Sequence, residues 1–325
     1  MERQKLIEIW LKEQFPEKPF SLHPASSDAS FRRYFRASFQ DSTLIVMDAP
    51  PSREDCRPFL KVAQLFQGAG VHLPEVISQD LEQGFLLLSD LGNRTYLDAL
   101  EAGNADRLYS DAADSLVKIH LASRPDVLPE YDEALLLKEM NLFREWYLER
   151  HLGLQLSEKQ QAILDTVFSR IIENNLSQPR VYVHRDFHSR NLMVTDPNPG
   201  ILDFQDAVYG PVTYDLVSLF RDAYIGWEEE KVLDWVIRYW EKARRAGLPV
   251  RSEFAEFYRD FEWMGAQRQL KVAGIFSRLH HRDGKDGYLE DIPLVLSYLK
   301  KTCMRYPELS PLLRLIENIA VGTTF

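Results

Sequence analysis

The feature that most constrains the fold is a single change of pattern near residues 90–92. Strand-like runs precede it, at 31–39, 43–47, 75–78 and 84–88, together with helical runs at 2–14 and 53–69. Amphipathic helical segments follow it, near 105–122, 133–151 and 157–175, and again from Pro211 to about residue 320. Strands collected in one part and helices in the other predict an α+β protein. We expect a small lobe with an antiparallel sheet over residues 1–91, and a larger, mainly helical lobe over 92–325.

Charge and hydropathy exclude several classes of protein. The 325 residues carry a formal net charge of -10, which argues against binding to nucleic acid. No apolar run approaches the roughly 20 residues that a membrane span needs, and residues 1–5 lack the apolar core of a signal peptide. We therefore expect a cytoplasmic protein with no membrane partner. Cys56 and Cys303 form no metal-binding pattern and are expected to be packing thiols.

The helical part is interrupted once, by three β-like pieces at 181–183, 192–194 and 200–202. Between the first two lies HRDFHSRN (184–191), which fits the pattern H-R-D-x-x-x-x-N of the kinase catalytic loop. The tetrapeptide LDFQ (202–205) follows at a kinase-like distance. The sequence therefore predicts ATP-dependent phosphoryl transfer.

The residue types in this loop suit that reaction. A carboxylate must orient the attacking hydroxyl and accept its proton, and Asp186 is the candidate base. Asn191 and Asp203 offer oxygen ligands for Mg²⁺, which bridges the phosphates of the nucleotide. The alternative is that Asp186 and Asn191 only make local turn hydrogen bonds. His184 is expected to anchor the loop rather than to act in catalysis.

With these motifs the sequence resembles the aminoglycoside phosphotransferase/choline kinase superfamily, whose members share a bilobal protein-kinase-like fold and phosphorylate small molecules. Within it, the chain looks most like the anomeric kinases of N-acetylmuramate and N-acetylglucosamine. The stretches that carry this likeness are 27–36, 47–51, 202–207, 267–276 and 282–285.

The resemblance implies phosphorylation of the sugar C1 hydroxyl, in the recycling of cell-wall peptidoglycan. The resulting α-1-phosphate would pass to a uridylyltransferase, a metabolic coupling that the residues themselves do not show. By the same resemblance, Ser89 and Leu91 would offer backbone groups to adenine, and Asp215 would brace the catalytic loop. The oligomeric state is left open.

Two parts of the protein-kinase pattern are missing. The phosphate-covering loop corresponds to residues 26–30, which contain no glycine, so we expect Ser27 and Ser30 to contact phosphate instead. The lysine expected at the strand position 46–48 is absent.

A strand arginine could replace that lysine. Alternation places Arg32 and Arg36 on one face of the strand and Arg33 on the other. We assign Arg33 to the nucleotide. The alternative is that all three arginines are solvated strand charges, in which case the chain could be a non-catalytic binding module.

The acceptor must place its hydroxyl near Asp186, which makes His188 and Gln205 candidate substrate residues. Arg190 is expected to stabilise charge during transfer, although it could line the substrate pocket instead. Glu262 and Arg268 are further substrate candidates, because an arginine could read the carboxylate of N-acetylmuramate. A cationic drug or an amino alcohol stays open as the acceptor.

Overall fold

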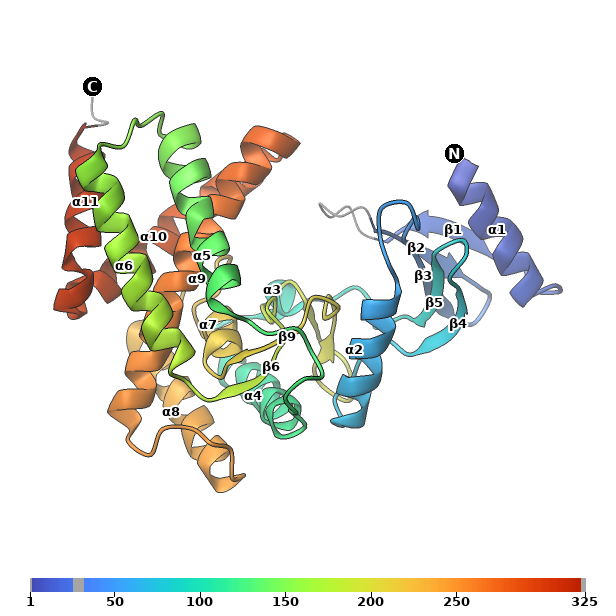
Figure 1. Cartoon of the computed structure of the whole chain (residues 1–325). Coiled ribbons are helices and arrows are strands. Elements are labelled where there is room, and N and C mark those ends of the chain that lie inside the picture. Colours follow the sequence, from blue (N-terminus) through green and yellow to red (C-terminus); the bar gives the residue numbers. More distant parts are fainter. Residues whose placement is uncertain (1, 26–31, 323–325) are drawn as a thin grey trace. The chain divides into compact units, whose positions relative to one another are not determined.

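The computed structural model describes residues 2–25 and 32–322, which fall into two compact units (Figure 1). The first unit comprises Met1–Arg94 with Met193–Asp206, and the second comprises Thr95–Leu192 with Ala207–Phe325. The division expected at residues 91 and 92 differs from this one, because segment 193–206 returns to the first unit. A main-chain hydrogen bond of 2.9 Å from Ile201 to His72 attaches it there, and the His72 ring contacts the Pro197 carbonyl at 2.7 Å.

An antiparallel five-stranded sheet forms the centre of the first unit, in the order β1-β2-β3-β5-β4. Its strands are β1 (Ser21–Pro24), β2 (Arg33–Ser38), β3 (Thr43–Asp48), β4 (Val76–Asp80) and β5 (Phe85–Ser89). The expected hairpin is confirmed, with Arg33 opposite Asp48 and Ser38 opposite Thr43. Strand β1 was not expected; it has four residues and is stabilised by pairing with β2.

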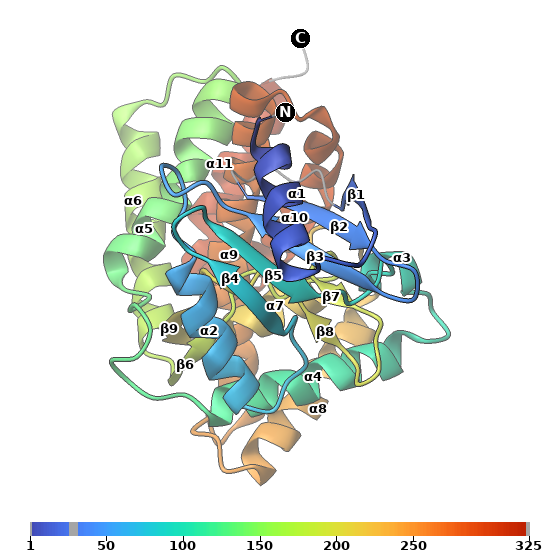
Figure 2. The same ribbon diagram turned by 90° about the vertical axis from the view of Figure 1, so that its right-hand side faces the viewer.

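Two helices accompany this sheet. Helix α1 (Glu2–Gln14) buries Ile7, Trp10 and Leu11 against the apolar side chains of one sheet face (Figure 2). Helix α2 (Arg57–Gly68) begins four residues later than expected, where Pro58 occupies the first turn, a position that proline favours. Phe59 on α2 packs on Phe204, with 4.7 Å between ring centroids, and this contact holds segment 193–206 to the first unit.

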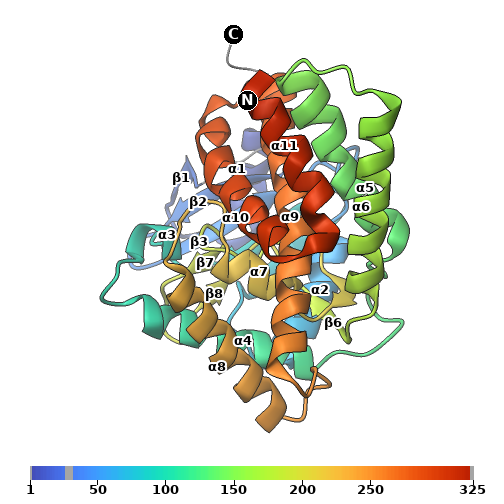
Figure 3. The same ribbon diagram turned by 90° about the vertical axis from the view of Figure 1, so that its left-hand side faces the viewer.

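Helices make up most of the second unit (Figure 3). The α-helices are α3 (Tyr96–Ala99), α4 (Ala105–Leu121), α5 (Glu133–Leu142), α6 (Glu158–Leu176), α7 (Tyr214–Phe220), α8 (Glu229–Arg245), α9 (Phe254–Asp283), α10 (Ile292–Arg305) and α11 (Ser310–Gly322). The expected helix over 133–151 is wrong in its second half, which is the π-helix η1 (Phe143–His151). Two short 3-10 helices, η2 (Asp286–Asp291) and η3 (Pro307–Leu309), flank α10. None of the helices within the described ranges is long and apolar enough to span a membrane.

Four short strands frame the loop of interest. Strand β6 (Arg180–Val183) pairs antiparallel with β9 (Val208–Pro211), and β7 (Leu192–Met193) pairs with β8 (Gly200–Ile201). Strand β9 was not expected, because its sequence, VYGP, lacks a run of strand-forming residues. Segment 184–191 therefore connects the end of β6 to the start of β7.

The central helix of the second unit is α9, which has 30 residues and packs against α5, α6, α7, α10 and η1. Gly274 allows the close approach to α5, since a Cβ there would lie 2.3 Å from the main-chain carbon of Leu142. Several polar side chains on α9 are buried, among them Glu262, Arg268 and Lys271. Buried polar groups need partners, and those of α9 supply most of the site described next.

Candidate active site

The loop between β6 and β7 is fixed at its start by Asp215, the second residue of α7. The two oxygens of this buried carboxylate accept hydrogen bonds from the main-chain N–H groups of His184 (2.6 Å) and Arg185 (3.0 Å). Burial raises the pKa of Asp215, although the neighbouring His184 acts in the opposite direction. The predicted bracing role of Asp215 is confirmed by these two bonds.

The same stretch of loop has an unusual backbone. Arg185 has a φ of 78°, in the left-handed region that non-glycine residues seldom occupy. His184 accepts a hydrogen bond at Nδ1 from the main-chain N–H of Asp186, at 3.2 Å, and so anchors the loop as predicted. Strained backbone of this kind persists where surrounding contacts fix it, and it is frequent in active sites.

Further contacts fix the rest of the loop. Asp222 accepts a hydrogen bond from the Ser189 N–H at 2.8 Å. The side-chain amide of Asn191 donates to the main-chain carbonyl of Asp186 at 3.0 Å. The bond from Asn191 ties the candidate metal ligand to the candidate base within the second unit.

Asp186 is held in its ionised form. Burial on its own would raise the pKa of this carboxyl, but the positive charges of Lys271, His188, Arg268 and Arg185 outweigh burial and lower it to about 2. The site therefore offers a carboxylate that accepts hydrogen bonds at any physiological pH.

Among these charges, that of Lys271 on α9 lowers the pKa of Asp186 most. Lys271 was not predicted from the sequence. Its buried ammonium group donates to the Tyr214 hydroxyl at 2.8 Å and pairs with Glu139 on α5 at 3.1 Å. Burial would lower the pKa of Lys271, but Glu139 raises it above its ordinary value. The sequence feature that could have identified Lys271 is its position among the apolar residues 270, 272 and 273 of a helix.

Glu139 is the counter-charge of this network and was also missed. It accepts a hydrogen bond from the Arg185 guanidinium at 2.6 Å and another from the Gln267 amide at 3.0 Å. Burial would raise the pKa of Glu139, but Lys271 and Arg185 lower it to about 2. The network therefore joins α5, α9 and the catalytic loop through charged groups.

Arg268, expected to bind substrate, is buried beside this network. Its guanidinium donates to the Arg185 carbonyl at 3.0 Å and to the Tyr214 hydroxyl at 3.2 Å. These bonds support the loop backbone from α9. The predicted contact of Arg268 with substrate stays a prediction.

His188 and Arg190 lie on the far half of the loop. The Arg190 guanidinium stacks over the Tyr224 ring at 3.7 Å and is exposed; within the described ranges it makes no hydrogen bond to the protein. The Nδ1 atom of His188 is buried and has no hydrogen-bond partner in those ranges either. Burial lowers the pKa of His188, although the negative charges of Asp222 and Asp186 act to raise it. Both side chains therefore keep polar groups available for a ligand.

Glu262, the other substrate candidate on α9, lies in a separate buried cluster. Its Oε1 accepts hydrogen bonds from Arg221, at 2.9 Å, and from Arg305. Its Oε2 accepts one from the Tyr306 hydroxyl at 2.8 Å. Both oxygens are thus used within the helical unit, and a role for Glu262 in substrate binding stays a prediction.

Asp203 and Gln205 belong to the first unit. Asp203 is exposed and has a φ of 61°, in the same left-handed region as Arg185. The Gln205 amide donates to Asp203 Oδ1 at 2.7 Å, while the buried Gln205 Oε1 has no hydrogen-bond partner among the described residues. A backbone held in this conformation points to a functional role for Asp203.

The residues assigned to the nucleotide also lie in the first unit. Ser27 and Ser30 fall outside the described residues. The Ser89 N–H donates to the Glu75 carbonyl at 2.9 Å, and Leu91 follows as a half-buried residue. The Arg33 guanidinium bonds to the fully buried Asp48, with 3.1 Å from Nε to Oδ2.

Comparisons with known proteins show the family to which the chain belongs. A family model described as "Phosphotransferase enzyme family" matches residues 21–254. An N-acetylmuramate/N-acetylglucosamine kinase of Neisseria meningitidis is 52% identical over the whole of both chains. A kinase of the same name from Pseudomonas aeruginosa is 52% identical, over 98% of this chain and 94% of that protein.

Solved structures share the fold at low sequence identity. Choline kinase LicA from Streptococcus pneumoniae aligns with a TM-score of 0.66 at 13% identity, over 93% of this chain and 100% of that one. The ADP-bound aminoglycoside phosphotransferase APH(2'')-Ib aligns with a TM-score of 0.61 at 16% identity, over 91% and 98% of the two chains. The predicted α+β, protein-kinase-like fold is confirmed.

The charge network makes a prediction about Asp186 itself. Replacing Lys271 by methionine removes the strongest attraction for the carboxylate and leaves the effect of burial, so the pKa of Asp186 should rise from about 2 toward or above its ordinary value of 3.8. A carboxyl ¹³C NMR titration, with the Asp186 signal identified by its loss in Asp186→Asn, measures this change. Lys242→Met is the control, since Lys242 pairs with Asp114 on α4. An unchanged Asp186 titration in Lys271→Met would contradict the assignment.

Proposed function

Because the chain belongs to the phosphotransferase enzyme family, we propose that it transfers the γ-phosphate of ATP to the anomeric C1 hydroxyl of N-acetylmuramate and N-acetylglucosamine. The observation that best supports phosphoryl transfer is the ionised Asp186, in a loop braced by Asp215. The choice of acceptor rests on the two bacterial relatives at 52% identity.

Asp186 would act on the acceptor hydroxyl. The hydroxyl donates a hydrogen bond to the carboxylate, its oxygen forms the new bond to the γ-phosphorus, and the bond from that phosphorus to the bridging oxygen of ADP breaks. A carboxylate whose pKa is about 2 is a weak base, so it takes the proton late, once bonding to phosphorus has made the hydroxyl acidic. An anomeric hydroxyl suits this site, because the ring oxygen makes it more acidic than an ordinary alcohol.

Asn191 and Asp203 stay the proposed ligands of Mg²⁺. Carboxylate and amide oxygens are donors that Mg²⁺ prefers, and proteins commonly supply only one or two of them while phosphates supply others. The described residues contain no group of three or more histidine, cysteine or acidic side chains that could hold a metal. This donor set fits an ion that arrives with the nucleotide, and the bound ion would neutralise charge on the phosphates.

The remaining assignments are proposals of the same kind. Ser27, Ser30, Ser89 and Leu91 would contact the nucleotide, and His188 would use its unpartnered Nδ1 on the sugar. Gln205 would similarly offer its unpartnered Oε1, and Glu262 stays a weaker candidate. We further propose that the chain works in the cytoplasm, where the sugar phosphate would pass to a uridylyltransferase.

A panel of acceptors tests the reaction. With magnesium-ATP, the purified chain should release ADP in the presence of N-acetylmuramate or N-acetylglucosamine, but not with choline or kanamycin. Asp186→Asn should lower kcat by about 100-fold or more, the usual contribution of a positioned base. Asp165→Asn, on the exposed face of α6, is the matched control and should keep full activity. Turnover with the cationic acceptors alone would replace the proposed substrate, and no turnover with any acceptor would favour a binding module.

The two sugars also separate the roles of Arg190 and Arg268. We propose that Arg190 stabilises charge on the transferred phosphoryl group, so Arg190→Ala should lower kcat by about 100-fold with both sugars. A loss of activity confined to N-acetylmuramate would contradict this role and would indicate that Arg190 binds the sugar carboxylate.

For Arg268, the proposed contact with that carboxylate predicts that Arg268→Ala loses activity selectively with N-acetylmuramate. Equal losses would leave Arg268 with the supporting role that its bond to Arg185 indicates.

A further inference from the structure

A kinase of this kind needs a cation near the nucleotide phosphates, and the strand positions 46–48, where a lysine is expected, contain Val46, Met47 and Asp48 instead. Asp48 is fully buried and binds two arginines. Arg3 donates to its Oδ1 at 2.8 Å, and Arg33 donates to its Oδ2 at 3.1 Å. If Arg33 turned toward a ligand, the buried Asp48 carboxylate would keep only one of its two arginine partners, which is costly. Arg33 is therefore better explained as part of the sheet.

Arg36 also uses its guanidinium for hydrogen bonds within the protein. Its guanidinium binds Asp90 through two hydrogen bonds of 2.6 and 3.1 Å, and it donates to the Gly92 carbonyl at 2.8 Å. Asp90 is mostly buried, and Arg36 lowers the pKa of this carboxyl against the effect of burial. Three hydrogen bonds fix Arg36 to the segment that follows β5. Two of the three candidate arginines thus hold the first unit together.

Arg32 has different surroundings. It donates to Glu54 at 3.2 Å, and both side chains are largely buried, with 14% and 19% of their surfaces exposed. The carboxylates of Asp206 and Asp203 also attract this guanidinium. All four residues belong to the first unit. Of the three candidate arginines, Arg32 is therefore the one whose guanidinium is attracted by Asp203, the proposed magnesium ligand of that unit.

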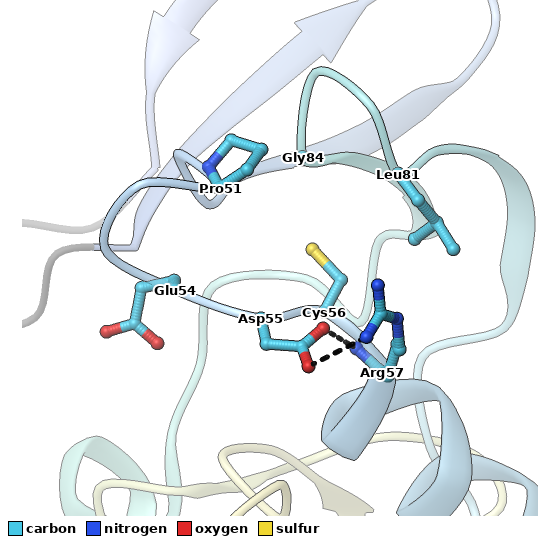
Figure 4. Close-up of a pocket in the computed structure, with 7 residues that line it drawn as sticks. All are labelled: Pro51, Glu54, Asp55, Cys56, Arg57, Leu81 and Gly84. Carbon is cyan, nitrogen blue, oxygen red and sulfur yellow. Dashed lines mark hydrogen bonds and ion pairs between the residues drawn. The ribbon is translucent and has the colours of Figure 1, made fainter.

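Glu54 also lines a neighbouring pocket, and its carboxylate accepts the hydrogen bond from Arg32. That pocket, of about 240 Å³, is lined by Pro51, Glu54, Asp55, Cys56, Arg57, Leu81 and Gly84. Figure 4 shows Asp55 turned toward Arg57, with Glu54 pointing away from that pair. A buried arginine held by a glutamate that precedes a helix has the same chemistry as the lysine–glutamate ion pair of protein kinases.

We propose that Arg32, positioned by Glu54, is the cation that binds the α- and β-phosphates of the nucleotide in this chain. The inference rests on the proposed use of ATP. One carboxylate accepts a hydrogen bond from this guanidinium and two more attract it, an excess of negative charge that suits a site shared with a divalent cation. The guanidinium would donate to phosphate oxygens, for which its planar fork is well suited. In the sequence, Arg32 lies two residues after the segment 26–30, which corresponds to the glycine-rich loop.

Binding of ADP and of adenosine to the full chain, measured by calorimetry in EDTA, tests this inference without a metal contribution. Arg32→Ala should weaken ADP binding by about 10- to 100-fold, the usual effect of losing charge-assisted hydrogen bonds, and should change adenosine binding by less than about twofold. Arg32→Lys should recover part of the ADP affinity. Glu54→Gln should weaken ADP binding less than Arg32→Ala does. Asp55→Asn and Arg57→Ala, on the neighbouring exposed pair, are matched controls that should bind both ligands normally.

The outcomes are distinct. Unchanged ADP affinity in Arg32→Ala would overturn the inference while leaving ATP use intact. Equal losses of ADP and adenosine affinity would also overturn it, because they would indicate a structural role for Arg32. Failure of the wild-type chain to bind either ligand would contradict the proposed use of ATP and the inference with it.

Discussion

The attraction between Asp186 and the buried cations of α9 is the interaction on which the candidate active site depends. Burial on its own would raise the pKa of Asp186, and the positive charges of Lys271 and Arg268 are among those that lower it to about 2. The same cations also hold the loop in place, because Arg268 donates to the Arg185 carbonyl. Helix α9 thus contributes to both the charge and the position of the proposed base, together with Asp215 of α7.

This arrangement places several charges where water has little access. Buried ion pairs seldom add net stability, since the loss of hydration offsets most of their attraction. Glu139 reduces that cost by pairing with both Lys271 and Arg185. Function explains such a network better than stability does, because hydrophobic residues of similar size would pack there at lower cost. The buried pairing of Asp48 with Arg3 and Arg33 is the comparable cluster in the first unit.

Local patterns in the sequence predicted the β2–β3 hairpin, helix α1 and the position of the catalytic loop, since each depends on residues close together in the chain. Strands β1 and β9 were missed because segments of only four residues gain strand geometry from pairing with another strand. Glu139 and Lys271 were missed for the same reason, since their meaning depends on contact between α5 and α9. Alternation separates the faces of a strand but does not show which face carries other acids, so the sequence alone could not decide between Arg33 and Arg32 as the residue that binds the nucleotide.

The position of the phosphate on the product tests the central claim most directly. ³¹P NMR of the product from N-acetylglucosamine and magnesium-ATP should show a phosphorus nucleus coupled to the anomeric proton, and Asp186→Asn should give no such signal. Phosphate at another carbon would contradict anomeric transfer while keeping a sugar kinase. Inorganic phosphate as the only product would contradict the account, because water rather than a sugar hydroxyl would then be the acceptor.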